Sequence, residues 1–103
     1  MPNKYGARKT EVDNIEFDSQ AEARRYGELK LLEYNGDITN LIIHPLFPMV
    51  HDGQKICDYE ADFSYCENGE LIIEDTKGFL TDVYKLKRKM MKIFHHVDIF
   101  ETG

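Results

Sequence analysis

Residues 62–77 read DFSYCENGELIIEDTK, and this stretch decides the fold. Its central pair, Asn68-Gly69, separates two β-prone segments, and both residues readily adopt the positive φ values that a type I′ turn requires. A two-residue turn there pairs residues whose numbers add up to 137. The sequence therefore predicts a β-hairpin in which Asp62 lies directly across from Asp75.

This opposed pair of carboxylates predicts a metal site. Directly opposed side chains in a hairpin have β-carbons roughly 4.5–5.5 Å apart, so the two charges repel unless something compensates them. Mg²⁺ suits such a pair, because it binds one or two carboxylates together with water and phosphate oxygens. Lys77 projects from the same face as Asp75, across from Glu60, where it can orient or deprotonate an attacking water. The set favours phosphodiester hydrolysis; the alternative is a solvated pair of strand carboxylates near a lysine.

A predicted helix over residues 19–34 carries a further acid. Ser19 and Glu22 have the spacing of a capping box, and Asn35-Gly36 provides the stop signal. Glu22 also shares an inward stripe with Tyr26, so it can face the acidic pair. Two roles for Glu22 therefore stay open, a cap carboxylate and a member of the metal site.

Five other elements are predicted, with the bounds Ile38–Val50, Lys55–Tyr65, Leu71–Lys77, Thr81–Phe94 and Val97–Phe100. The first is an edge strand bent at Pro45 and Pro48, the second is one alternating strand, and the third is the returning strand of the hairpin. The fourth is a helix and the fifth a short last strand. The order α-β-β-β-α-β predicts an α/β (mixed α+β) domain, a central mixed four-stranded sheet flanked by helices. The side chains expected on the core face of the second helix are Val83, Leu86, Met90 and Ile93 or Phe94.

Size and composition are those of one domain, residues 1–103, with a basic N-terminal arm over residues 1–12. No apolar run approaches the roughly 20 residues that cross a bilayer, so no membrane partner is expected. The start does not read as a signal peptide, and Cys57 and Cys66 have no metal-type spacing. We therefore expect reduced cysteines in a cytosolic protein.

The net charge of −6 is unevenly distributed. Residues 11–80 hold 5 basic and 16 acidic residues, whereas residues 1–10 have three basic and no acidic residues, and residues 81–94 have five against one. Basic ends around an acidic middle can hold a phosphate backbone at the edges and a metal at the centre. The residues expected to bind DNA are Lys4, Arg8, Lys9, Lys85, Lys87, Arg88, Lys89 and Lys92. The alternative is that both basic runs are only solvent-exposed surfaces. The four histidines (44, 51, 95 and 96) have no ligand spacing and are interpreted as structural or surface residues.

Five stretches carry a resemblance to a known family: KYGARK (4–9), FDSQAEARRY (17–26), YEADF (59–63), IEDTKG (73–78) and TDVYKLKRK (81–89). In this order they resemble a small family of phage- and prophage-encoded proteins placed among the PD-(D/E)xK nucleases and described as Holliday-junction-resolvase-like. The resemblance implies a restriction-endonuclease-like core and a homodimer. Similar nucleases often have Gln-Pro on the first strand, where this chain has His44-Pro45, so no catalytic role is carried onto that position.

In that scheme Asp62 is the motif aspartate, Asp75 the second metal carboxylate and Lys77 the catalytic lysine. Glu22 is the acid of the first helix near the metal, and the Thr76 carbonyl is a further ligand. The expected function is a Mg²⁺-dependent DNA endonuclease, with Mn²⁺ as an alternative ion and no small-molecule cofactor, acting on branched DNA during phage replication or recombination. Two other readings stay open: a nuclease of plain duplex or damaged DNA, and a non-catalytic DNA-binding or regulatory module.

Overall fold

The hairpin at Asn68-Gly69 forms as predicted in the computed structural model, which describes residues 9–103 of the chain. Strands β6 (Phe63–Glu67) and β7 (Glu70–Thr76) pair antiparallel, from Glu67 opposite Glu70 to Phe63 opposite Glu74. Both turn residues have positive φ, 52° and 80°. The predicted register is therefore confirmed for these five pairs, and Asp62 and Asp75 are the two residues directly beyond the last pair, Phe63 and Glu74.

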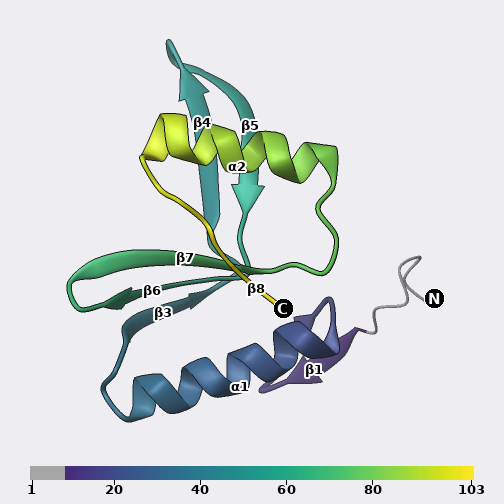
Figure 1. Ribbon diagram of the computed structural model, residues 1–103, viewed down its shortest axis with the longest axis vertical. Helices are drawn as coiled ribbons and strands as arrows, with labels where there is room; N and C mark the ends of the chain where they lie inside the picture. Colours follow the sequence, from purple (N-terminus) through teal and green to yellow (C-terminus); the bar gives the residue numbers. More distant parts are fainter. Residues whose placement is uncertain (1–8) are drawn as a thin grey trace.

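The hairpin lies at the centre of a four-stranded sheet with the order β3-β6-β7-β8. The outer strands are β3 (Thr39–Ile43), antiparallel to β6, and β8 (Phe100–Thr102), parallel to β7. Together with the two helices of residues 9–103, this gives the mixed α/β fold that the sequence predicts (Figure 1). The last strand begins at Phe100, where the predicted strand Val97–Phe100 ends.

Two predicted long strands are each broken into two. Ile38–Val50 forms β3 and β4 (Leu46–His51), and Lys55–Tyr65 forms β5 (Gln54–Glu60) and β6. β4 and β5 form a separate two-stranded sheet, which stands away from the main sheet (Figure 1). The tight turn of this sheet, at residues 52–53, was not predicted. Both of its residues have positive φ in the structure.

The two breaks face each other. Pro45 lacks an amide hydrogen and His44 has a left-handed φ of 54°, so the ladder cannot continue there. The His44 amide donates to the Asp62 carbonyl (2.9 Å), and the Ala61 amide donates to the Pro45 carbonyl (3.0 Å). As a result Glu60 pairs with Leu46 in the second sheet, and the prediction that it lies across from Lys77 is wrong.

The first helix, α1 (Gln20–Tyr34), has the predicted ends. The hydroxyl of Ser19 accepts a hydrogen bond from the Glu22 amide (3.1 Å), and Asn35 caps the other end. The helix packs on one face of the main sheet, against a core of Phe17, Ala23, Tyr26, Leu29, Ile38, Phe63 and Tyr65. A small sheet of β1 (Thr10–Val12) and β2 (Ile15–Phe17) contacts it, so residues 10–12 of the expected arm form a strand. Residues 1–8 lie outside the described residues.

The second helix, α2 (Asp82–His95), begins at the predicted cap, where the Thr81 hydroxyl accepts from the Tyr84 amide. It covers the β4–β5 sheet, and its buried residues are Tyr84 and Met91. The predicted core face is confirmed in part: Met90 and Phe94 are half-buried and pack against the core, whereas Val83, Leu86 and Ile93 are 64%, 59% and 62% exposed.

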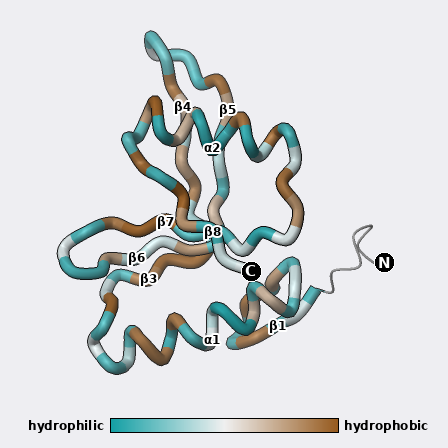
Figure 2. The backbone as a smooth tube through the Cα atoms, viewed as in Figure 1, coloured by the Kyte–Doolittle hydropathy of each residue, from teal (hydrophilic) through white to brown (hydrophobic). Residues whose placement is uncertain are grey.

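Val83, Leu86 and Ile93 are exposed because α2 packs on only two strands, β4 and β5. It contacts them through the stripe that contains Tyr84 and Met91. The core on this side is Met49, Tyr59, Ala61, Ile73, Tyr84 and Met91. Hairpin tips are hydrophilic, and hydrophobic residues lie nearer the centre of the molecule (Figure 2). Within residues 9–103, none of the helices has the length and apolar character needed to cross a membrane.

Candidate active site

Asp62 and Asp75 meet where the β4–β5 hairpin leaves the main sheet. The Asp62 amide donates to Oδ1 of Asp75 (2.8 Å), and the Thr76 amide donates to Oδ2 of Asp62 (2.7 Å). These bonds continue the β6–β7 pairing beyond its last regular pair. The structure therefore brings the predicted acidic pair together and places Thr76 beside it.

Asp75 is a fully buried carboxylate with three partners. Its Oδ1 accepts from the Asp62 amide, its Oδ2 accepts from the Tyr59 hydroxyl, and the Lys77 Nζ lies 3.7 Å from Oδ2. Burial raises the pKa of Asp75 from 3.8 to about 6, although the Lys77 charge and the hydrogen bonds act in the opposite direction. Asp75 is thus mostly ionised at neutral pH and protonated in mild acid.

Lys77 is held between this carboxylate and an aromatic ring. Its Nζ lies 4.3 Å from the centre of the Tyr84 ring, a distance at which the cation is attracted to the π face. Tyr84 is itself anchored, because its hydroxyl donates to Glu101 (2.5 Å) and Arg88 binds the same Glu101 oxygen (2.7 Å). The ammonium group therefore has a defined position next to Asp75.

Glu22 is buried on the other side of Asp62. Its Oε1 lies 2.7 Å from Nε2 of His44, and its Oε2 accepts from the Asp18 amide (3.3 Å). Burial, and next the negative charge of Asp62, raise its pKa. Glu22 therefore binds the amide of Asp18, one residue before the Ser19 amide of the predicted capping box, and it lies near Asp62. Its place in a metal site stays a prediction.

His44 is a site residue that the sequence analysis missed. It lies at the break between β3 and β4, its ring contacts Glu22, and its positive charge when protonated lowers the pKa of Asp62. The net pKa of Asp62 is nevertheless raised, chiefly by burial. A non-glycine residue held at positive φ is uncommon and often marks a functional site. The sequence signal was the position itself, a histidine directly before Pro45 at the bend of the predicted strand.

Glu74 lies on the opposite face of β7 and joins α1 to the sheet. It is fully buried and accepts two hydrogen bonds from Arg25 (2.7 and 2.9 Å) and one from the Tyr65 hydroxyl (2.7 Å). All of its close partners come from the α1 side. Glu74 is therefore an anchor for the helix and lies outside the acidic cluster.

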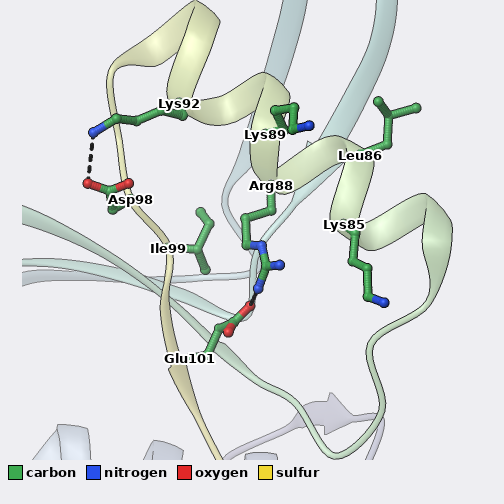
Figure 3. A pocket seen from close by; sticks show the side chains of 8 residues that line it. All are labelled: Lys85, Leu86, Arg88, Lys89, Lys92, Asp98, Ile99 and Glu101. Carbon is green, nitrogen blue, oxygen red and sulfur yellow. Dashed lines mark hydrogen bonds and ion pairs between the residues drawn. The ribbon is translucent and has the colours of Figure 1, made fainter.

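The predicted DNA-binding residues divide into four groups. Lys4 and Arg8 lie outside the described residues, and Lys9 is paired with Glu16 (3.4 Å). Lys87 is half-buried. The remaining four line a groove of about 600 Å³ between α2 and the C-terminal segment, whose lining residues are Lys85, Leu86, Arg88, Lys89, Lys92, Asp98, Ile99 and Glu101 (Figure 3).

The acidic pair fits a hard divalent cation by its chemistry. All its donors are oxygens, the ligands that Mg²⁺ prefers, and burial raises the pKa of both Asp62 and Asp75. Within residues 9–103, no group of three or more His, Cys, Asp or Glu side chains is arranged to hold a metal. An ion here would be held by these two carboxylates, with its other positions left to water or substrate.

The fold and this cluster define a mixed α/β domain with buried carboxylates and a fixed lysine at the junction of two sheets. Residues 2–100 match the model of the family described as Protein of unknown function (DUF1064). The chain belongs to this family. The search of curated proteins found no match.

Proposed function

We propose that this protein is a metal-dependent DNA endonuclease with a PD-(D/E)xK-type site. One observation carries the proposal: Asp62 and Asp75 are joined by a 2.8 Å hydrogen bond at the end of two paired strands, with the Lys77 ammonium 3.7 Å from Asp75. Two carboxylates and a lysine at the ends of two central strands are the groups that metal-assisted phosphodiester hydrolysis needs.

Each residue has a role that follows from its position. Asp62 and Asp75 would hold Mg²⁺ or Mn²⁺, and the bound ion would supply Lewis acidity and a water of lowered pKa. The hydroxyl of Tyr59 and the amide of Asp62 fix the orientation of Asp75. Lys77, held on the Tyr84 ring, orients or deprotonates the attacking water and stabilises the charge that develops on the phosphoryl group.

The finer parts of the proposal rest on the family resemblance. They are a restriction-endonuclease-like core, branched DNA as the substrate, a homodimer that nicks two strands symmetrically, and action in the cytoplasm of a bacterium that carries the phage or prophage gene. The basic groove on α2 supports a nucleic acid substrate, because it concentrates positive charge in a chain of net charge −6.

The test compares cleavage of a four-way junction with cleavage of linear duplex of the same sequence, in Mg²⁺ and in EDTA. The wild-type protein, Asp75→Asn and the control Glu70→Gln are measured side by side; Glu70 is an exposed acid on the same strand. We expect paired nicks in the junction that need Mg²⁺, are lost in Asp75→Asn and persist in Glu70→Gln.

The other outcomes are equally informative. Cleavage of both substrates would keep the site and overturn the preference for junctions. No cleavage of either substrate, or cleavage that survives Asp75→Asn, would contradict the proposed site.

A further inference from the structure

The groove between α2 and the C-terminal segment has an internal charge balance. Its two acids are both occupied: Asp98 pairs with Lys92 (2.8 Å) and Glu101 pairs with Arg88 (2.7 Å). Lys85 and Lys89 are exposed and, among residues 9–103, have no ion-pair partner. They are one helical turn apart on the groove side of α2, so the groove presents two uncompensated positive charges.

The groove also has non-polar walls. Leu86, 59% exposed, and Ile99 line it together with the basic residues (Figure 3). The lysines can bind phosphates, and the aliphatic side chains can contact the less polar groups between them. This lining therefore suits a chain of linked phosphates better than a small, isolated anion. A nucleic acid strand has this alternation, with its sugars between its phosphates.

Glu101 connects the groove to the candidate active site. In the parallel pairing of β7 and β8, Glu101 is the partner of Asp75. Its Oε2 accepts from the Tyr84 hydroxyl, and the Tyr84 ring carries the Lys77 ammonium. A ligand in the groove would therefore lie next to the strand that carries Asp75.

We propose that this groove binds backbone phosphates of the DNA strand, next to the phosphate at the acidic pair, and that the Glu101 carboxylate holds Arg88 until the strand arrives. Lys85 and Lys89 attract the strand, and a phosphate then competes with Glu101 for the guanidinium of Arg88. Arg88 suits this exchange because its planar fork binds carboxylate and phosphate alike. The inference rests on the proposed function for the choice of DNA as the ligand.

The test measures DNA binding without metal, so that no cleavage is needed. Binding of a labelled duplex is followed by fluorescence anisotropy over a range of salt concentrations. Each phosphate contact contributes about 0.9 to the slope of log K against log salt, so Lys85→Ala with Lys89→Ala should reduce the slope by about 2. The matched control is Lys30→Ala with Lys55→Ala, which removes the same charge from exposed lysines elsewhere.

A second variant tests the role of Glu101. Glu101→Gln weakens the hold on Arg88, so it should tighten DNA binding more than Glu70→Gln, which removes the same charge from an exposed strand position. Equal effects of these two variants would overturn the competition at Arg88. Equal slopes for the groove and control lysine pairs would overturn the groove as the binding site.

A competitor and a cleavage assay separate the remaining possibilities. Inorganic phosphate at constant ionic strength should not displace the duplex; displacement would make the groove a site for free phosphate instead. Groove-dependent binding without any Mg²⁺-dependent cleavage would contradict the proposed function and leave this inference standing. Cleavage by the wild-type protein, with unchanged slopes in the lysine variants, would support the proposed function and contradict this inference.

Discussion

Lys77 has two neighbours that act on its ammonium in different ways. The Asp75 carboxylate, 3.7 Å away, attracts it as a charge, and the Tyr84 ring, 4.3 Å away, attracts it as a quadrupole. Because the Lys77 side chain remains 26% exposed, a substrate can still reach the ammonium. The geometry thus favours a role in the reaction over a purely structural ion pair.

We expect Lys77→Ala to lower kcat by at least about 100-fold while it changes substrate affinity by less than about threefold, the pattern of a group that acts in the transition state. Steady-state and single-turnover kinetics on the cleaved substrate measure both effects. The control is Lys55→Ala, which removes a lysine whose partner is the half-buried Asp58. Wild-type kcat in Lys77→Ala would remove Lys77 from the mechanism.

For single residues, the sequence predicts contacts between positions that lie close together in the chain. The pairing of Asp62 with Asp75 follows from a two-residue turn only a few positions away, so the hairpin signal sufficed. The contact between His44 and Glu22 joins residues 22 positions apart, and although Pro45 indicates a bend, no local pattern predicts which residue the His44 ring contacts. Such a residue is found only when the tertiary structure is known.

Among the elements, the helix ends and the turn at Asn68-Gly69 were predicted well, whereas the strand lengths and the turn at residues 52–53 were not. Ser19, Thr81 and Asn68-Gly69 act through hydrogen bonds or dihedral preferences of their immediate neighbours. The strand breaks at His44 and Asp62 depend on two segments that bend together, and in Lys55–Tyr65 the alternation of residue types continues through the break. The core face of α2 was predicted only in part, because Tyr84 and Met91, together with Met90 and Phe94, are the residues that pack against its partner sheet.

The attachment of α1 to the main sheet gives a prediction about stability. In Arg25→Ala the fully buried Glu74 keeps only its hydrogen bond from Tyr65, and we expect the free energy of unfolding to fall by about 3–5 kcal/mol. Urea denaturation checks this. Arg24→Ala is the control, because Arg24 is exposed on the same helix. Equal losses in the two variants would contradict the anchor role of Glu74.

For the whole molecule, the buried acids make stability depend on pH. The pKa of Asp75 is raised from 3.8 to about 6, so between about pH 4 and pH 6 the folded state binds more protons than the unfolded chain. Stability therefore falls as pH rises through this window, by roughly 3 kcal/mol from this residue. The raised pKa values of Glu22 and Asp62 act in the same direction, whereas the lowered pKa of Glu101 opposes them.

A bound divalent ion should reverse this loss, since it compensates the ionised carboxylates. We expect Mg²⁺ or Ca²⁺ to raise the Tm at pH 7.5 and to have little effect at pH 5, where Asp75 is largely protonated. Thermal melting with metal and with EDTA tests this. In Asp75→Asn both the metal response and most of the pH dependence should disappear. An unchanged Tm at pH 7.5 would contradict a metal site at the acidic pair.

The hydrogen bond from the Thr76 amide to the Asp62 carboxylate has a consequence for genetics. Asp62 is at once a candidate ligand and the group that closes the end of the β6–β7 pairing, so its replacement harms folding and chemistry together. The Lys77 side chain closes no strand pairing, although its ammonium compensates the charge of the buried Asp75. In a mutational scan scored separately for protein abundance and for activity, position 62 would be depleted in both scores, and position 77 more strongly in activity than in abundance.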